Sequence, residues 1–424
     1  MSMPFKSFRR DSAGTLPILF AAALLPLLGF AGGAIDYGRS LVDRTRLNNA
    51  LDAAVIAGAQ AAGQADTKGL SQPMVIAAAN AAALASFKAN FKLPTDAKPV
   101  FSTQITDRSV LVNGSYTAST SATLLQVLGF RSLPIQGIAQ SGVDLAPAVD
   151  IYLLVDVSGS MATGATASDI AALRANLGGC AFACHDGVKV RGTNYDSFEW
   201  AQANGIGLRL NEMNTGLKDF MSWLQKQPNA GTRFRVALYS FSNNLTKLVD
   251  ITSDLTQVGI NLPKLPSASS RTEGGTHFME NMPQFASVVG VGGDGITRPK
   301  KLVIIATDGV QDKDRTWAEA ANPVAAGQGV APFAPAACRT LDQSVFVGVL
   351  YTPYIDLNWD WGFNATLGQP SQVGGKGRRF DDIVPQLQSC ASAANLYVNA
   401  STVTSVGEAF AAIVKVFTQI RLSK

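Results

Sequence analysis

Residues 150–161 read Asp-Ile-Tyr-Leu-Leu-Val-Asp-Val-Ser-Gly-Ser-Met, an apolar run followed at once by a polar loop. An apolar run of this length predicts a strand that is buried on both faces of a sheet. The loop places one carboxylate, Asp156, and two hydroxyls, Ser158 and Ser160, within a few residues of one another. These are hard oxygen donors, which suit Mg²⁺, Mn²⁺ or Ca²⁺ and suit zinc poorly.

Two further segments offer oxygen ligands of the same kind. A second apolar strand run, 301–307, ends at Asp308, and Thr276 follows two glycines between the two runs. In a doubly wound sheet, the loops at the carboxyl ends of the strands converge on one crevice. We therefore expect five oxygen side chains to meet there as a metal site. These are Asp156, Ser158, Ser160, Thr276 and Asp308.

The remainder of this half of the chain alternates strand and helix patterns, which predicts a doubly wound, Rossmann-type α/β domain. The expected strands are 234–241, 247–251 and 345–350, and the expected helices are 211–225, 381–394 and 406–420. Two stretches, 162–200 and 351–380, exceed a minimal domain of this kind. Long loops at such a crevice are often functional, so these two stretches could shape a recognition surface. The alternative is that they are disordered additions.

The five oxygen positions resemble the metal-ion-dependent adhesion site (MIDAS) of von Willebrand factor A domains, and all five match without substitution. The resemblance implies an A domain over residues 148–424. It implies that Ser158, Ser160 and Thr276 contact the ion directly or through water, while Asp156 and Asp308 act mostly through water. It also implies that a carboxylate of a partner protein completes the shell. The alternative is a family fold that keeps the loop but binds the ion weakly or not at all.

The N-terminal part of the chain predicts a membrane anchor. Residues 15–35 are nearly all apolar, and about 20 such residues span a bilayer as a helix. Basic residues at Lys6, Arg9 and Arg10 place residues 1–14 in the cytoplasm. We expect a single-pass protein of the inner membrane whose bulk is periplasmic. The alternative is a signal peptide cleaved near the small residues 31–34.

A helix is expected to continue beyond the membrane to Gly63, since Leu47, Leu51 and Val55 recur at helical spacing. It serves either as a spacer or as a helix that packs beside pilin-like helices. Residues 70–92 predict a second helix, and 100–105, 109–118 and 135–143 predict strands, with a short helix or loop at 121–129. The segment 36–147 would then be a stalk helix with a small α+β module, whose role is structural.

Several N-terminal motifs resemble TadG-type Flp (tight-adherence) pilus assembly proteins. They are Arg-Arg-Asp-x-x-Gly at 9–14, Asp-Tyr-Gly-Arg at 36–39 and Leu-Asn-Asn-Ala-Leu-Asp-Ala-Ala at 47–54. The C-terminal residues 409–423 also resemble TadG ends. Related TadE-type pseudopilins carry a glutamate shortly after a processing glycine. Here Leu19 stands five residues after Gly14, so prepilin-peptidase cleavage is not predicted.

The chain has 4 cysteines and 2 histidines, too few for several zinc sites. Three residues separate Cys180 from Cys184, whereas the c-type haem motif has two. In an oxidising periplasm we expect disulfides Cys180–Cys184 and Cys338–Cys390, although four cysteines permit three pairings.

Composition narrows the classes of function. The chain has 424 residues, 47% hydrophobic and 16% charged, with a net charge of +4. So small a surplus of positive charge, without a tract of basic residues, argues against nucleic-acid binding. A hydrolase at the oxygen cluster would need a general base, for which His277 is the one candidate, but no Gly-x-Ser-x-Gly motif is present. We therefore predict no catalytic residue and no enzymatic activity.

The leading hypothesis is a membrane-anchored component of pilus assembly or adhesion. Its A domain would use Mg²⁺, or Mn²⁺ or Ca²⁺, to bind an acidic group on a protein partner, either another pilus assembly component or a surface ligand. The alternatives are a structural scaffold without an essential ion and, with less support, a metal-assisted hydrolase.

Overall fold

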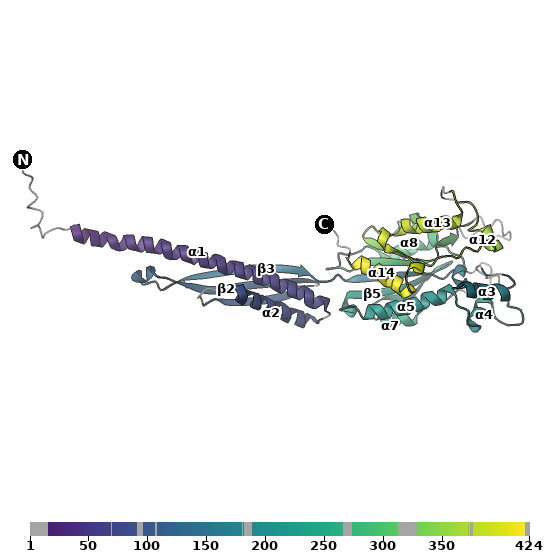
Figure 1. Cartoon of the computed structure of the whole chain (residues 1–424), viewed down its shortest axis with the longest axis horizontal. Coiled ribbons are helices and arrows are strands. Elements are labelled where there is room, and N and C mark those ends of the chain that lie inside the picture. The colour runs from purple at the N-terminus through teal and green to yellow at the C-terminus, as the bar shows by residue number, and fades with distance from the viewer. Residues whose placement is uncertain are drawn as a thin grey trace, which may run out of the picture. The chain divides into compact units, whose positions relative to one another are not determined.

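The computed structural model describes residues 16–68, 70–90, 96–106, 108–179, 181, 189–265, 274–312, 329–371, 373 and 376–419. The chain divides into two compact units, Met1–Leu145 and Ala146–Lys424 (Figure 1). Each unit has its own hydrophobic clusters.

The first unit begins with one long helix, α1 (Leu16–Thr67). It is apolar and long enough near its N-terminal end to cross a membrane. The expected end at Gly63 is wrong by one turn, because the helix continues through Ala65 and Asp66, both of which are buried. Asp66 is held there by Arg108, whose Nη2 lies 3.1 Å from its Oδ2.

A second helix and a small sheet pack on α1. Helix α2 (Gln72–Asn90) is followed by β1 (Lys98–Thr106), β2 (Ser109–Ser121) and β3 (Ser132–Asp144). The strands form an antiparallel sheet in the order β1-β2-β3, and a 3₁₀ turn, η1 (Leu125–Leu128), joins β2 to β3. Alternate residues of β2 are buried, so one face of the sheet packs on the helices while the other is more exposed. The expected helix and all three expected strands are confirmed.

The second unit is built on a six-stranded sheet with the order β11-β10-β7-β4-β5-β6. All neighbouring strands are parallel except β6, which runs antiparallel to β5 at one edge. Starting from β4, the chain builds outward in both directions, which is the doubly wound arrangement expected from the sequence. The strands are β4 (Val149–Asp156), β5 (Phe234–Phe241), β6 (Leu245–Thr252), β7 (Lys300–Thr307), β10 (Val345–Tyr351) and β11 (Tyr397–Asn399).

Helices cover both faces of this sheet, which explains the unbroken apolar run Ile151–Val155 in β4. Ile151 and Leu153 join the core on one face, whereas Tyr152 and Leu154 join the core on the other. The first core is covered by α5 (Arg209–Gln225), α7 (Leu255–Ile260) and α14 (Val406–Gln419). The second is covered by α8 (Phe278–Val289), α11 (Pro335–Cys338) and α13 (Arg379–Cys390).

Helix α13 is shorter than the expected 381–394. The backbone of Ala391 is extended, and Ser392 then exchanges two hydrogen bonds with Val347 of β10. This pairing turns the chain toward β11 and ends the helix. Cys390, the last residue of α13, forms a disulfide with Cys338 of α11, with 5.5 Å between the Cα atoms, as predicted. The second predicted disulfide, Cys180–Cys184, lies outside the described residues.

The two long stretches fold where the structure describes them. The first contains α3 (Ala167–Asn176), which Thr166 caps, and leads into α4 (Ser197–Ala203). The second contains α12 (Trp361–Ala365), and its Leu357, Phe363 and Leu367 are fully or almost fully buried in the core. The described parts of both stretches are therefore integral to the domain. A short hairpin, β8 (Val310–Asp312) with β9 (Val330–Pro332), also follows β7.

Candidate metal centre

Two neighbouring parallel strands bring the predicted carboxylates to the same edge of the sheet. Asp156 is the last residue of β4, and Asp308 follows the last residue of β7 directly. Both side chains are 0% exposed. Because these strands are parallel and paired in register, their carboxyl ends coincide, and the two aspartates interact electrostatically.

The first loop arranges its own hydroxyls around Asp156. The Oδ1 atom of Asp156 accepts hydrogen bonds from the Ser158 backbone N, at 2.9 Å, and from the Ser158 Oγ, at 2.6 Å. The Oγ atoms of Ser158 and Ser160 lie 3.0 Å apart. A 3₁₀ turn, η2 (Gly159–Ala162), holds this compact loop. One carboxylate and two hydroxyls are thus fixed within a single hydrogen-bonded group.

The Thr276 segment lies beside this loop. The carbonyl of Gly274 accepts a hydrogen bond from the backbone N of Gly159 at 2.7 Å. On its other side, the backbone N of His277 donates to the carbonyl of Ser242, just after β5, at 3.0 Å. Thr276 itself is 6% exposed. The loops that carry all five predicted ligands therefore meet at one edge of the sheet.

Thr307 belongs to this cluster, although it was not among the predicted residues. Its Oγ1 donates to Asp156 Oδ2 at 2.7 Å and accepts from the backbone N of Gly309 at 3.0 Å. Thr307 therefore positions the second oxygen of Asp156. Its one signal in the sequence is a hydroxyl residue that ends an otherwise apolar strand.

Arg209 is a second residue that the sequence did not reveal. It is the first residue of α5, is 5% exposed, and places its Nη1 3.5 Å from Asp308 Oδ2. Its Nη2 donates to the carbonyl of Pro353 at 2.9 Å, and its guanidinium carbon lies 4.5 Å from the centre of the Tyr354 ring. A fixed positive charge therefore lies on one side of Asp308.

Burial makes both carboxylates difficult to ionise. Burial, together with the charge of Asp308, raises the pKa of Asp156 to about 8. Burial also raises the pKa of Asp308, although Arg209 and hydrogen bonds from Ser160 and Tyr354 oppose that rise. The pKa of Tyr354 is raised well above 10 by burial and by Asp308. Two buried carboxylates that repel each other are stabilised in their charged form by a nearby cation.

The donor set fits a hard divalent cation. It consists of carboxylate and hydroxyl oxygens, the ligands that Mg²⁺, Mn²⁺ and Ca²⁺ accept. Within the described parts of the chain, no group of three or more His, Cys, Asp or Glu side chains offers another metal site. His277 lies just before α8, is buried, and has its Nδ1 3.9 Å from Glu280 Oε2.

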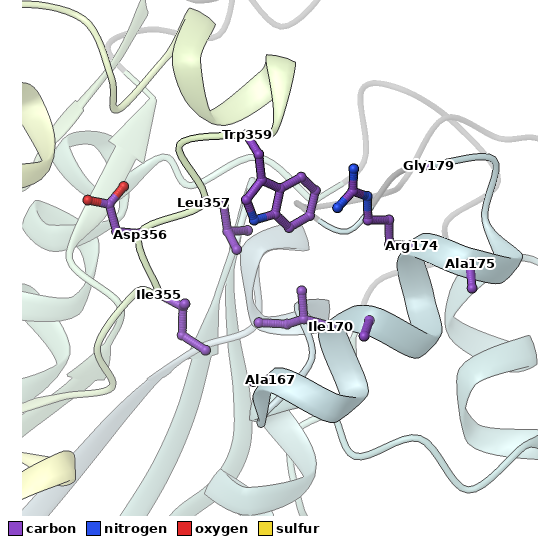
Figure 2. Close-up of a pocket in the computed structure, with 10 residues that line it drawn as sticks. Ala167, Ile170, Arg174, Ala175, Gly179, Ile355, Asp356, Leu357 and Trp359 are labelled. Carbon is purple, nitrogen blue, oxygen red and sulfur yellow. The ribbon is translucent and has the colours of Figure 1, made fainter.

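The two long stretches meet near this edge and enclose a hollow. A pocket of about 530 Å³ lies between α3 and residues 355–359 (Figure 2). The guanidinium of Arg174 lies over the Trp359 ring, 4.0 Å from its centre, while Ile170 and Leu357 line the floor. The first stretch also contacts the start of α5, because the backbone N of Arg209 donates to the carbonyl of Thr163 at 3.1 Å.

Comparison with known proteins gives a match at the N-terminus. Residues 14–61 match the family model described as putative Flp pilus-assembly TadE/G-like. A search of curated proteins gave no match. The family match covers the apolar part of α1 and most of its packed part.

Solved structures show weak overall similarity. The pilus adhesin SpaC from Lactobacillus rhamnosus GG is 15% identical, with 76% of this chain and 34% of SpaC covered and a TM-score of 0.34. The chain thus spans about a third of that adhesin. The von Willebrand factor domain of the type V pili tip protein Mfa5 from Porphyromonas gingivalis is 11% identical, with 66% and 99% covered and a TM-score of 0.35.

The family match and the strand order each describe one part of the chain. The six-stranded sheet has one antiparallel edge strand, β6, and the Asp-x-Ser-x-Ser loop follows its central strand, β4. Residues 14–61 are similar to the TadE/G-like family of Flp pilus assembly, and the second unit has a doubly wound, Rossmann-like α/β fold.

Proposed function

We propose that this protein is a membrane-anchored component of pilus assembly or adhesion, whose A-like domain binds a protein partner through a divalent cation. The TadE/G-like segment and the apolar start of α1 support the pilus context and the anchor. On this proposal the chain crosses the inner membrane once, with its N-terminus in the cytoplasm and both units in the periplasm.

The observation that carries the metal proposal is the cluster of buried oxygens at the carboxyl ends of β4 and β7. Ser158, Ser160 and Thr276 would supply hydroxyl ligands, and Asp156 and Asp308 would supply negative charge close by. The bound ion would supply a positive centre that attracts a carboxylate of the partner. Arg209 offsets part of the charge of Asp308, so the site presents less negative charge than two free carboxylates.

The surrounding surface supports recognition of a protein. The described parts of both long stretches are folded, and they contribute Arg174 and the 42%-exposed Trp359 to the rim of a pocket. Tryptophan and arginine are enriched among residues that dominate binding at protein interfaces. The proposed role is therefore binding to a protein partner, without an enzymatic step.

The test is pilus-dependent adhesion of cells that carry either the natural protein or Asp156→Ala, with Mg²⁺ and with EDTA. The proposal expects adhesion to require Mg²⁺ and to be lost with Asp156→Ala. Asp250→Ala is a matched control, because Asp250 is an exposed aspartate of β6 that pairs with Lys247. Adhesion that is unchanged by both EDTA and Asp156→Ala would instead support an ion-free scaffold.

A further inference from the structure

The turn between β2 and β3 exposes an unusual concentration of apolar side chains. We call residues 122–131 the hairpin tip; it includes η1. Four large apolar residues of the tip face outward, with exposed fractions of 43% for Leu124, 76% for Val127, 50% for Leu128 and 59% for Phe130. No charged residue occurs between Ala122 and Phe130. A turn that faces water normally carries polar residues, so this composition requires a different environment.

The hairpin tip lies directly against the apolar part of α1. Two glycines of α1 lie close to the tip: a Cβ atom added to Gly32 would lie 2.7 Å from Leu124 Cβ, and one added to Gly29 would lie 3.0 Å from Leu128 Cδ1. Figure 1 shows the β2–β3 hairpin running along α1 toward its N-terminal end. Residues 29–35 belong to the predicted membrane span. At about 1.5 Å per residue, the tip extends about 10 Å along that span.

Asp36 fastens the tip to the helix at the end of the span. Its Oδ2 accepts hydrogen bonds from the backbone N atoms of Thr123, Leu124 and Leu125 at 3.0, 2.8 and 2.8 Å. Arg39, one turn further along α1, donates to the Thr123 Oγ1 at 3.2 Å. These hydrogen bonds therefore hold the tip in a fixed position on α1.

The backbone of the tip is also satisfied internally. Val127, Gly129 and Phe130 donate their backbone N–H groups to carbonyls of the tip itself, at 3.2, 3.0 and 3.1 Å. The Gln126 side chain donates to the carbonyl of Ala122 at 2.6 Å. In hydrocarbon each unsatisfied polar group costs several kcal/mol, so internal pairing of this kind is what a buried turn in lipid needs.

Charged residues appear just where the tip would leave the lipid. Arg131 and Arg39 are exposed and lie at the base of the tip. Arginine at this depth can reach the lipid headgroups, while the apolar residues beyond it face the acyl chains. On α1, residues such as Leu27 and Leu28 are also exposed and continue the same apolar surface.

We propose that the hairpin tip is inserted into the outer part of the bilayer beside α1, where lipid acyl chains cover Leu124, Val127, Leu128 and Phe130. The chain would thus contact the membrane twice, through a spanning helix and through a turn folded back onto it. This inference rests on the membrane anchor of the proposed function and is independent of the metal site. It would fix the orientation of the first unit relative to the membrane surface.

The test uses the full chain in lipid nanodiscs with one chain per disc. A cysteine at Val127, labelled with an environment-sensitive fluorophore, reports the surroundings of the tip, and doxyl-labelled lipids quench labels that touch acyl chains. Val127 is mostly exposed, so its replacement leaves the packing intact. The chain without an added cysteine gives the background, and far-ultraviolet circular dichroism checks the fold of each labelled chain.

Two further positions make the outcomes distinct. Ala22→Cys places a label in the predicted span, and Gln140→Cys places one on β3, eight residues and about 27 Å beyond Ser132. We expect blue-shifted emission at positions 22 and 127, with quenching by doxyl lipids several-fold greater than at 140. Quenching at 22 but not at 127 contradicts the inserted tip and leaves the anchor standing. Quenching at neither position 22 nor position 127 contradicts both the anchor and the inserted tip. A blue shift at 127 without quenching indicates that protein covers the tip, and it also contradicts the inference.

Discussion

Asp36 in the first unit and Asp156 in the second are both buried aspartates, at 2% and 0% exposure. Three backbone N–H groups donate hydrogen bonds to one oxygen of Asp36. Asp156 instead accepts from the side chains of Ser158 and Thr307 and lies near a second carboxylate. A carboxylate whose hydrogen bonds all come from backbone N–H groups holds structure together, whereas one grouped with hydroxyls and a like charge is suited to hold a cation.

The largest effect is expected at Asp36. Asp36→Ala removes three hydrogen bonds to a charged acceptor and leaves their donors unpaired, which lowers the stability of the first unit. Amide hydrogen exchange at Thr123–Leu125 should accelerate strongly, while affinity for Mg²⁺ should not change. Asp36→Asn keeps one acceptor oxygen and should be intermediate. Slow exchange at these amides in Asp36→Ala would show that the tip is held by other contacts.

A smaller loss of stability is expected when Arg209, whose positive charge lies beside Asp308, is replaced. Without an ion, Arg209→Met leaves a buried carboxylate unpaired and should cost about 3 kcal/mol in thermal unfolding. Mg²⁺ should restore part of this loss, because it supplies the missing positive charge.

The control for this prediction is Arg235→Met, which breaks the 2.7 Å pair with Asp150 on the same sheet. Its loss of stability should be the same with and without Mg²⁺. If Arg209→Met is likewise insensitive to Mg²⁺, then the ion does not act at Asp308.

The pKa of Asp156 predicts a pH dependence of stability. Since its pKa is about 8 in the folded, ion-free protein and about 3.9 when unfolded, the folded state holds an extra proton between these values. The contribution of this proton to the free energy of unfolding is therefore complete at low pH. It is lost as the pH rises through about 8, by at most about 1.4 kcal/mol per pH unit.

The measurement is the difference in unfolding free energy between the natural chain and Asp156→Asn, followed in EDTA from pH 5 to pH 8. The natural chain should lose stability relative to the variant as the pH rises, and Mg²⁺ should remove that loss. A difference that is constant with pH would mean that Asp156 is already ionised without an ion.

The smallest effect is expected at Thr307. Thr307→Val removes one hydrogen bond to Asp156 and should cost about 1 kcal/mol. Because Thr307 positions the carboxylate and is not a predicted ligand, affinity for Mg²⁺ should fall only a few-fold, whereas Thr276→Val should lower it much more. Calorimetric titration of the two variants distinguishes these roles, and equal losses would make Thr307 a ligand in its own right.

The sequence could predict what short-range patterns encode. The strand at 149–156 is apolar from Ile151 to Val155 because its two faces enter two cores, and the ligand loop follows it directly. Long-range pairs carry no such signal: 99 positions separate Arg209 from Asp308, and 89 separate Asp36 from Leu125. The end of α13 was also missed, because it depends on pairing between Ser392 and Val347 across the fold.

The central claim is that the oxygen cluster at Asp156 and Asp308 binds a divalent cation. Its most direct test is isothermal titration of the detergent-solubilised full chain with Mg²⁺, beside Asp156→Ala and the surface control Asp250→Ala. The account predicts one saturable site at or below millimolar Mg²⁺ in the natural chain and in Asp250→Ala, and none in Asp156→Ala. The absence of binding at millimolar Mg²⁺ in the natural chain, or equal binding in Asp156→Ala, would contradict it.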